Sequence, residues 1–115
     1  MKVLFIGDIF GEPGRRALAK AVPRLVAQRQ IDIVIGNGEN AAGGFGITPE
    51  LAEELFDLGL AVITTGNHAW DKKEVLDYFP RESRLLRPAN YPPGVPGKGS
   101  VVIETAGGER LAVLQ

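Results

Sequence analysis

Residues 2–8 read Lys-Val-Leu-Phe-Ile-Gly-Asp, and a similar pattern occurs twice more along the chain. Residues 31–40 read Ile-Asp-Ile-Val-Ile-Gly-Asn-Gly-Glu-Asn, and residues 60–68 read Leu-Ala-Val-Ile-Thr-Thr-Gly-Asn-His. Each is a short apolar run that suits a buried strand, followed at once by polar residues and glycine. We therefore predict strands over residues 2–6, 31–35 and 60–64, and we expect the first to be buried on both faces.

Helical signals separate these strands. Apolar residues at helical spacing follow Pro13 and predict a helix over residues 15–28, in which Pro23 predicts a kink or an early break. Thr48 has the side chain of a helix N-cap and is followed by proline, which predicts a helix over residues 49–57.

The later part of the chain predicts one more helix and a hairpin. Asp71 and Glu74 have the spacing of a capping box and predict a helix over residues 71–79. Residues 101–104 and 110–114 flank a glycine-rich turn, which indicates a β-hairpin. Strands that alternate with helices over short connections predict a layered α/β fold with a parallel sheet, followed by that hairpin.

The composition excludes several classes of function. Thirteen basic and fourteen acidic residues give a net charge of −1, so neither DNA wrapping nor adhesion to an anionic membrane is expected. There is no cysteine, which rules out disulfides and thiolate chemistry. No signal peptide and no membrane-spanning run is found, so we expect a cytoplasmic protein.

The end of the sequence predicts that residues 1–115 form the N-terminal part of a single domain. The last residues before Gln115 have the pattern of a strand interior, without a following turn or cap. A layered α/β fold also needs helices that cover every strand, and too few are predicted here.

Polar side chains follow each predicted strand of the sheet. Asp8 follows the first, Glu39 and Asn40 follow the second, and Asn67 and His68 follow the third. Ligands of open parallel sheets bind outside the carboxyl ends of the strands, so we expect these side chains to meet in space. Carboxylates, amides and an imidazole are ligands that suit Mn, Fe, Zn or Mg, which predicts a two-metal site.

A carboxylate can bridge two cations, and either Asp8 or Glu39 could do this, of which we favour Glu39. The glycines beside these residues are expected to allow close approach of the backbone. These are Gly7, Gly38 and Gly66.

Each candidate also has an ordinary structural interpretation. Asp8 could cap a helix, and the polar residues after the other two strands could serve only as turn residues. Phe45 and Trp70 are expected to be packing residues. Arg15 and Arg16 are expected to lie on a solvated helix face.

Three other functions can be compared with the same residues. A dinucleotide-binding domain needs closely spaced glycines after its first strand, and Gly7, Gly11 and Gly14 have the wrong spacing. A serine esterase is excluded because position 9 is isoleucine where the nucleophile would stand. A nucleotide- or metal-binding regulatory module without turnover remains an alternative.

Four stretches of the chain resemble a known family. They are Gly-Asp-Ile-Phe-Gly-Glu-Pro-Gly at 7–14, Asn-Gly-Glu-Asn-Ala-Ala-Gly-Gly-Phe-Gly-Ile-Thr at 37–48, Thr-Thr-Gly-Asn-His-Ala-Trp-Asp at 64–71 and Leu-Leu-Arg-Pro-Ala-Asn-Tyr-Pro-Pro-Gly at 85–94. Together they resemble the first half of the calcineurin-like metallophosphoesterases. Phe10 replaces the usual first histidine, and Glu39-Asn40 replaces the usual aspartate block, which is the pattern of the YmdB-like phosphodiesterases.

The resemblance implies a hydrolase of phosphodiesters such as 2′,3′-cyclic nucleotides. We expect its substrate to be a small molecule and the protein to be a candidate homo-oligomer. Asp8, Glu39, Asn40 and Asn67 would ligate two metal ions, iron or manganese, and His68 would be the catalytic acid. A metal-bridging hydroxide would attack phosphorus, and His68 would protonate the leaving group. The family completes its site with three further histidines, whereas this chain contains only His68.

Overall fold

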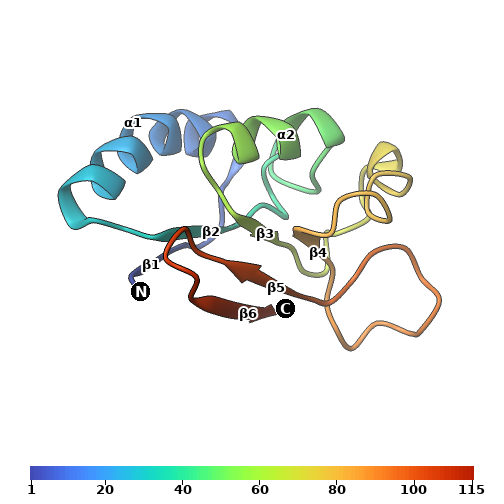
Figure 1. Cartoon of the computed structure of the whole chain (residues 1–115). Helices are drawn as coiled ribbons and strands as arrows, with labels where there is room; N and C mark the ends of the chain where they lie inside the picture. Colours follow the sequence, from blue (N-terminus) through green and yellow to red (C-terminus); the bar gives the residue numbers. More distant parts are fainter.

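The computed structural model describes all of residues 1–115 and contains helices and two β-sheets (Figure 1). The predicted α/β fold is confirmed. In chain order the elements are β1 (Val3–Ile6), α1 (Gly11–Arg29), β2 (Ile33–Asn37), α2 (Pro49–Asp57), β3 (Val62–Thr64), the 3₁₀ turn η1 (Lys73–Val75), β4 (Leu85–Leu86), β5 (Ser100–Glu104) and β6 (Arg110–Leu114).

The larger sheet consists of four parallel strands in the order β1-β2-β3-β4. Ile6 at the end of β1 pairs with Gly36, and Asn37 at the end of β2 pairs with Thr64. The carboxyl ends of the first three strands therefore lie side by side at one edge of the sheet. β5 and β6 form the predicted antiparallel hairpin as a separate sheet.

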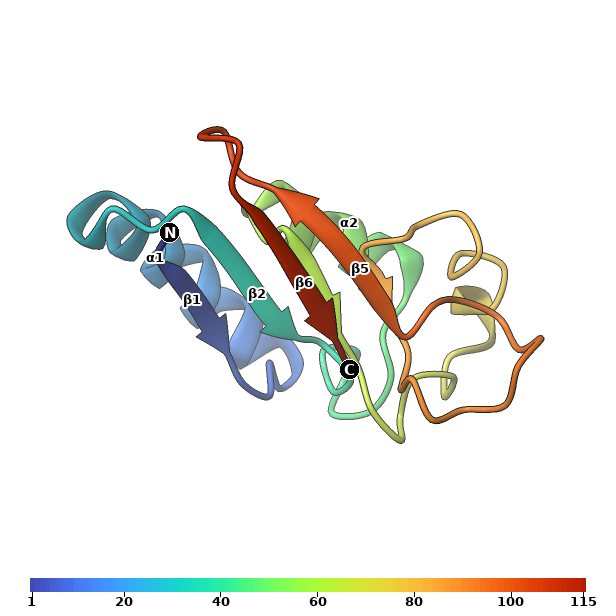
Figure 2. The same cartoon turned by 60° about the horizontal axis from the view of Figure 1, so that its bottom comes forward.

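Helices cover one face of the parallel sheet, and the hairpin covers the other face over β2, β3 and β4. α1 and α2 lie on one face and the hairpin lies on the other (Figures 1 and 2). Along β2, Val34 joins the core beneath the helices, whereas Ile33 and Ile35 join a second core with Val113 of the hairpin. This two-sided burial explains why β2 is a continuous apolar run.

β1 differs from the prediction that it is buried on both faces. Leu4 and Ile6 pack toward the helices, but Val3 is 42% exposed and Phe5 is 59% exposed. β1 is one of the two edge strands of the sheet, and the hairpin lies toward the other strands (Figure 2). An apolar run indicates a strand, but it does not show what covers each face.

α1 is longer than predicted. It begins at Gly11, where the amide of Gly14 donates to the carbonyl of Phe10 (3.0 Å), and it continues through Pro23 to Arg29. The predicted break at Pro23 does not occur. Pro23 and Ala19 lie on the exposed side of the helix, so the carbonyl that loses its amide partner can bond to water.

The predicted helix over residues 71–79 is wrong, because only the short turn η1 forms there. The Asp71 carboxylate does not cap a helix; its Oδ2 lies 2.6 Å from Nδ1 of His68. Lys72 has extended backbone angles, and Val75 and Phe79 are buried by the core. Tertiary contacts therefore override the capping-box signal.

β4 was not predicted, because two residues are too short to show any periodicity. Leu85 and Leu86 are fully buried and pair with β3. The preceding Arg84 ion-pairs with Glu82 (2.7 Å) and stacks over the ring of Phe56 (4.0 Å). This contact fixes the entry to β4 against α2.

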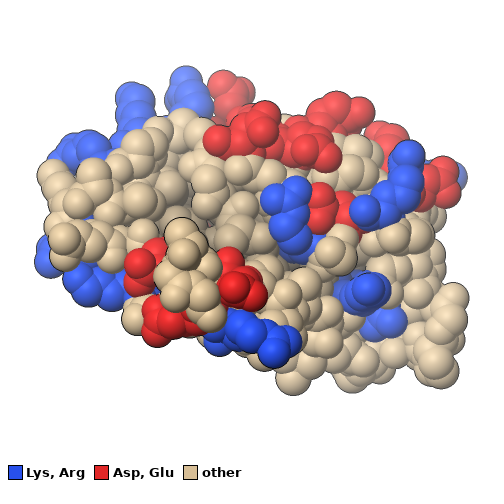
Figure 3. All heavy atoms as spheres, in the orientation of Figure 1, with Lys and Arg blue, Asp and Glu red and all other residues tan.

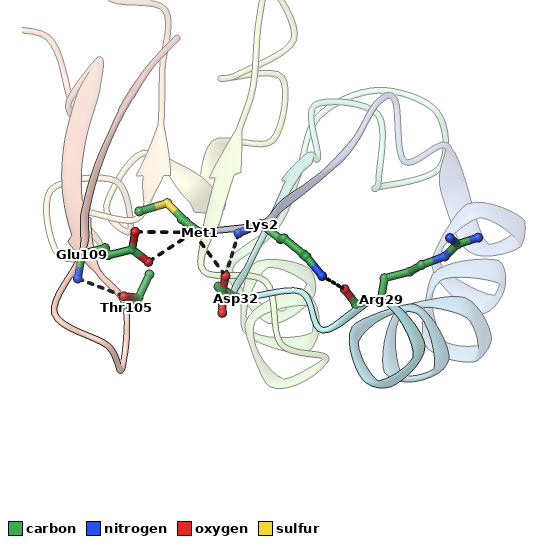
Figure 4. A network of polar contacts seen from close by, with 6 residues as sticks. All are labelled: Met1, Lys2, Arg29, Asp32, Thr105 and Glu109. Carbon is green, nitrogen blue, oxygen red and sulfur yellow. Dashed lines mark hydrogen bonds and ion pairs between the residues drawn. The ribbon is translucent and has the colours of Figure 1, made fainter.

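A polar network joins the start of β1 to the hairpin turn (Figure 4). The amino group of Met1 lies 3.3 Å from Glu109 and 3.9 Å from Asp32, and the amide of Lys2 donates to Asp32 (2.6 Å). The network lies at the end of the sheet away from the carboxyl ends of the strands. It links the parallel sheet to the hairpin where β1 begins, opposite to the loops that carry Asp8, Glu39 and His68.

Charges are segregated on the outer helices (Figure 3). α1 is rich in basic residues and α2 is acidic, and Arg15 meets Glu54 between them at 3.7 Å. An ion pair this exposed contributes at most about 1 kcal/mol. No helix is both long enough and apolar enough to cross a lipid bilayer.

We predict that replacing Glu82 by glutamine lowers stability in a pH-dependent manner. The hydrogen bond from Arg84 lowers the pKa of Glu82. A lowered pKa stabilises the fold above the unfolded-state pKa of about 4.3, and this contribution is lost as the pH falls through the folded-state pKa. Urea unfolding should show a deficit of about 1 kcal/mol at pH 7 that shrinks below about pH 4. The exposed Glu74→Gln is the control and should show no such trend.

Candidate functional site

The candidate site lies in three loops that follow β1, β2 and β3. The structure brings all five predicted residues to this edge of the sheet, and hydrogen bonds join four of them in two pairs. These residues are Asp8, Glu39, Asn40, Asn67 and His68. Residues distant in sequence thus contact each other in two pairs at the strand ends, and their assignment as metal ligands and acid stays a prediction.

Asp8 and Asn40 form the first pair. The amide of Asn40 donates to Oδ1 of Asp8 at 2.7 Å, which leaves the carbonyl oxygen of that amide without a partner in the chain. Asp8 has a φ of 37°, a left-handed conformation that non-glycine residues rarely adopt. Such a conformation costs on the order of 1–3 kcal/mol and is found most often at functional sites.

Glu39 and His68 form the second pair. The backbone amide of His68 donates to Oε2 of Glu39 at 3.3 Å. The Glu39 carboxylate also lies against Gly66, where an added Cβ would stand 2.5 Å from both carboxylate oxygens. Glycine at position 66 lets the carboxylate keep this position, whereas a Cβ there would push the carboxylate aside.

Asn37 connects the second and third loops, a role that sequence reasoning missed. Its amide donates to the carbonyl of Thr65 (3.2 Å) and to Oε1 of Glu39 (3.4 Å), while its own Oδ1 accepts from the Glu39 amide (3.4 Å). The sequence signal for this role was its position between Gly36 and Gly38 at the end of a strand. Asn37 thus fixes Glu39 from both ends.

Asp71 is the second missed residue. Its Oδ2 lies 2.6 Å from Nδ1 of His68, and the two side chains are 35% and 39% exposed. When Nδ1 carries the proton and donates to this carboxylate, Nε2 is left to face other groups. The signal was an aspartate three residues after the histidine, which sequence reasoning assigned to a helix cap.

The donor set suits a hard metal ion but is not a complete site. Asn67 is exposed, and its side chain makes no hydrogen bond within the chain. No three His, Asp or Glu side chains gather closely enough to hold a metal by themselves. Ligation by these residues therefore requires amide oxygens beside the carboxylates, which is a donor chemistry that Mg, Mn and Fe accept.

The three glycines of the site differ in their roles. Gly66 has the predicted role beside a functional carboxylate. Gly38 instead makes room for the core, because an added Cβ would lie 2.9 Å from Ile63. Gly7 has open space around it and no positive φ, so the expectation for Gly7 is wrong.

Of the expectations for three neighbouring side chains, that for Trp70 is confirmed, and those for Phe45 and Arg15 change. Trp70 packs as predicted, with its ring centroid 4.8 Å from that of Tyr91. Phe45 is 50% exposed and is not a core residue. Arg15 does more than face solvent, because its guanidinium donates to the carbonyl of Ala41 (2.5 Å) and so holds the second loop.

A family model described as YmdB-like protein matches residues 4–115. A 2′,3′-cyclic-nucleotide 2′-phosphodiesterase from Bacillus subtilis (strain 168) is 46% identical over 114 residues. The match includes 99% of this chain and 43% of that relative. The chain thus spans less than half the length of this curated relative.

Two solved structures share the fold. A hypothetical protein from Thermus thermophilus superposes with a TM-score of 0.90 and 45% identity, over 100% of this chain and 44% of its own. A protein from Mycoplasma pneumoniae described as a novel phosphatase superposes with a TM-score of 0.84 and 34% identity, over 90% of this chain and 38% of its own.

We predict that the methyl group of Gly66→Ala displaces the Glu39 carboxylate and lowers stability by about 0.5–1.5 kcal/mol, the contribution of one hydrogen bond that the carboxylate loses. The amide signal of His68 should shift in the same variant, since that amide donates to Glu39. Gly7→Ala is the matched control, and its effect should stay within about 0.5 kcal/mol. Chemical denaturation and ¹H–¹⁵N spectra measure both effects, and equal losses in the two variants would contradict the close approach at Gly66.

Proposed function

The chain belongs to the YmdB-like family, and from this premise we propose that the natural protein is a metal-dependent phosphodiesterase of small phosphodiesters, 2′,3′-cyclic nucleotides in particular. The Bacillus subtilis relative, a 2′,3′-cyclic-nucleotide phosphodiesterase, supports the reaction class. Because this chain covers 43% of that relative, the activity is proposed for the whole natural protein. Its cytoplasmic location and its assembly into a homo-oligomer stay predictions.

We assign metal binding to the oxygen donors at the strand ends. Asp8, Glu39, Asn40 and Asn67 would hold two ions, iron or manganese, with Glu39 as the bridging ligand. The ions would supply charge stabilisation for the phosphate and an activated water. Four oxygen donors cannot fill two coordination spheres, so further ligands must come from outside these residues. The room that Gly66 leaves for the Glu39 carboxylate supports this assignment.

The observation that carries the proposed mechanism is the contact between His68 and Asp71 beside Glu39. Asp71 accepts from Nδ1 of His68 at 2.6 Å and so orients the ring. The backbone amide of His68 is held by Glu39, which keeps the imidazole next to the proposed ligands. As the imidazolium, with Nδ1–H donated to Asp71, His68 would give its Nε2 proton to the leaving alkoxide as general acid and become neutral.

We expect His68→Ala in the natural protein to lower kcat for a 2′,3′-cyclic nucleotide by about 10²–10⁴ while metal content stays unchanged. The loss should be smaller for bis-p-nitrophenyl phosphate, because a nitrophenolate leaves without needing a proton. Asp71→Asn should reduce kcat in the same substrate-dependent way, and the exposed Asp77→Asn should not. Loss of metal from His68→Ala would instead make His68 a ligand, and nucleotide binding without turnover by the wild type would favour a regulatory module.

We expect Mn²⁺ added to the 115-residue chain to broaden the NMR signals of the strand-end residues before any others. Unpaired electrons broaden nearby signals, so the affected residues locate the ion independently of activity. Asp8→Asn and Glu39→Gln should each lower the Mn²⁺ affinity measured by this broadening more than about tenfold, as other lost metal contacts do. Asp57→Asn at the end of α2 is the control. Broadening spread over acidic α2 would contradict the assignment.

A further inference from the structure

Two exposed phenylalanines stand in the loops of the candidate site. Seven large apolar side chains of the chain are exposed, and five of them belong to Met1 or to strands of the two sheets. The other two are Phe10, which is 57% exposed, and Phe45, which is 50% exposed. Phe10 lies two residues after Asp8, and Phe45 lies in the loop that carries Glu39.

The Phe10 ring is held against the second loop. An added Cβ at Gly44 would stand 2.8 Å from Cζ of Phe10 and within 3.4 Å of two further ring atoms, so the ring lies on the Gly44 backbone. The amides of Gly11 and Gly44 both donate to the carbonyl of Asn40, at 3.0 and 3.1 Å. Phe10 is therefore tied to the residue whose side chain pairs with Asp8.

The Phe45 ring is held against the third loop. Nζ of Lys72 lies 4.0 Å from the ring centroid, so the ammonium covers the ring in a cation–π contact. An added Cβ at Gly46 would stand 2.9 Å from Lys72 and 3.2 Å from Asp71. Phe45 thus contacts Lys72, and the next residue, Gly46, lies close to Asp71, which contacts His68.

The exposure of these rings gives the fold no stability. Burying a phenylalanine side chain contributes about 1.5–3 kcal/mol to stability. Phe10 and Phe45 are each at least 50% exposed and lose much of this contribution. Phe10 lies on the backbone of Gly44, the residue before Phe45, so both rings border the same stretch of polar backbone, and Lys72 lies over the Phe45 ring. Such a surface suits a flat ligand with one aromatic face and polar edges better than it suits an acyl chain.

We propose that Phe10 and Phe45 bind the base of a nucleotide substrate whose phosphodiester occupies the adjacent site. The phosphodiester part of this statement rests on the proposed function, whereas base binding rests on the two rings. Aromatic side chains stack on every base, because each base has a π-face. The arrangement therefore selects nucleotides over base-free phosphodiesters and discriminates little among the bases.

The test compares two substrates of the natural protein, adenosine 2′,3′-cyclic phosphate and the base-free methyl riboside 2′,3′-cyclic phosphate. Phe10→Ala and Phe45→Ala should each raise KM for the adenosine substrate by about 5- to 100-fold. KM for the base-free substrate and kcat for both should stay unchanged. Unlike Phe45→Ala, Phe45→Trp should keep KM for the adenosine substrate low, because tryptophan also stacks.

Phe5→Ala is the matched control, since Phe5 is equally exposed but lies on β1. Unchanged KM for the adenosine substrate in both alanine variants would overturn the proposal. So would an equal rise for both substrates, and so would a change in oligomeric state with an unchanged KM, which would make the rings a packing surface.

Failure of the proposed function would look different, because the wild type would then hydrolyse neither substrate. Base binding is then measured directly with adenosine 3′-phosphate and ribose 5-phosphate in ¹H–¹⁵N spectra of the chain. Shifts at positions 10 and 45 with the nucleotide alone, lost in the alanine variants, would support the proposal. Equal shifts with both phosphates would overturn it.

Discussion

Parallel pairing of β1, β2 and β3 is the constraint on which the rest of the structure depends. Parallel strands in close register end at the same edge of the sheet, and here Ile6 pairs with Gly36 and Asn37 pairs with Thr64. The loops that follow are forced together, although they are about thirty residues apart in sequence. Helices on one face and the hairpin on the other then bury the central strands and hold the register.

Hydrogen bonds within these loops hold Asp8, Glu39, Asn40 and His68. Asn37 spans the second and third loops, and Gly66 leaves the space that the Glu39 carboxylate fills. Asp8 keeps a left-handed backbone conformation that the surrounding loops must support. Under the proposed function, groups held in this way would need little reorganisation when a substrate binds, which is the usual basis of electrostatic catalysis.

The same loops place apolar rings beside the polar groups. Phe10 lies on Gly44, and Phe45 is covered by Lys72, so both rings are fixed while much of their surface faces solvent. A polar centre flanked by rigid aromatic side chains is a common composition for sites that bind small organic ligands. The edge thus combines groups suited to phosphate chemistry with groups suited to an aromatic part of the same molecule.

The sequence by itself determined the first three strands of the parallel sheet, the first two helices, the hairpin and the polar residues at the strand ends, but not β4. Apolar runs, the cap at Thr48 and glycine-rich turns are local signals, and local signals survive folding when tertiary contacts agree with them. Tertiary structure alone decided what local signals cannot encode. Asp71, which the local signal assigns to a helix cap, instead contacts His68. The outer face of β1 remained uncovered, and Phe45 became exposed, because both outcomes depend on which distant segments lie beside them.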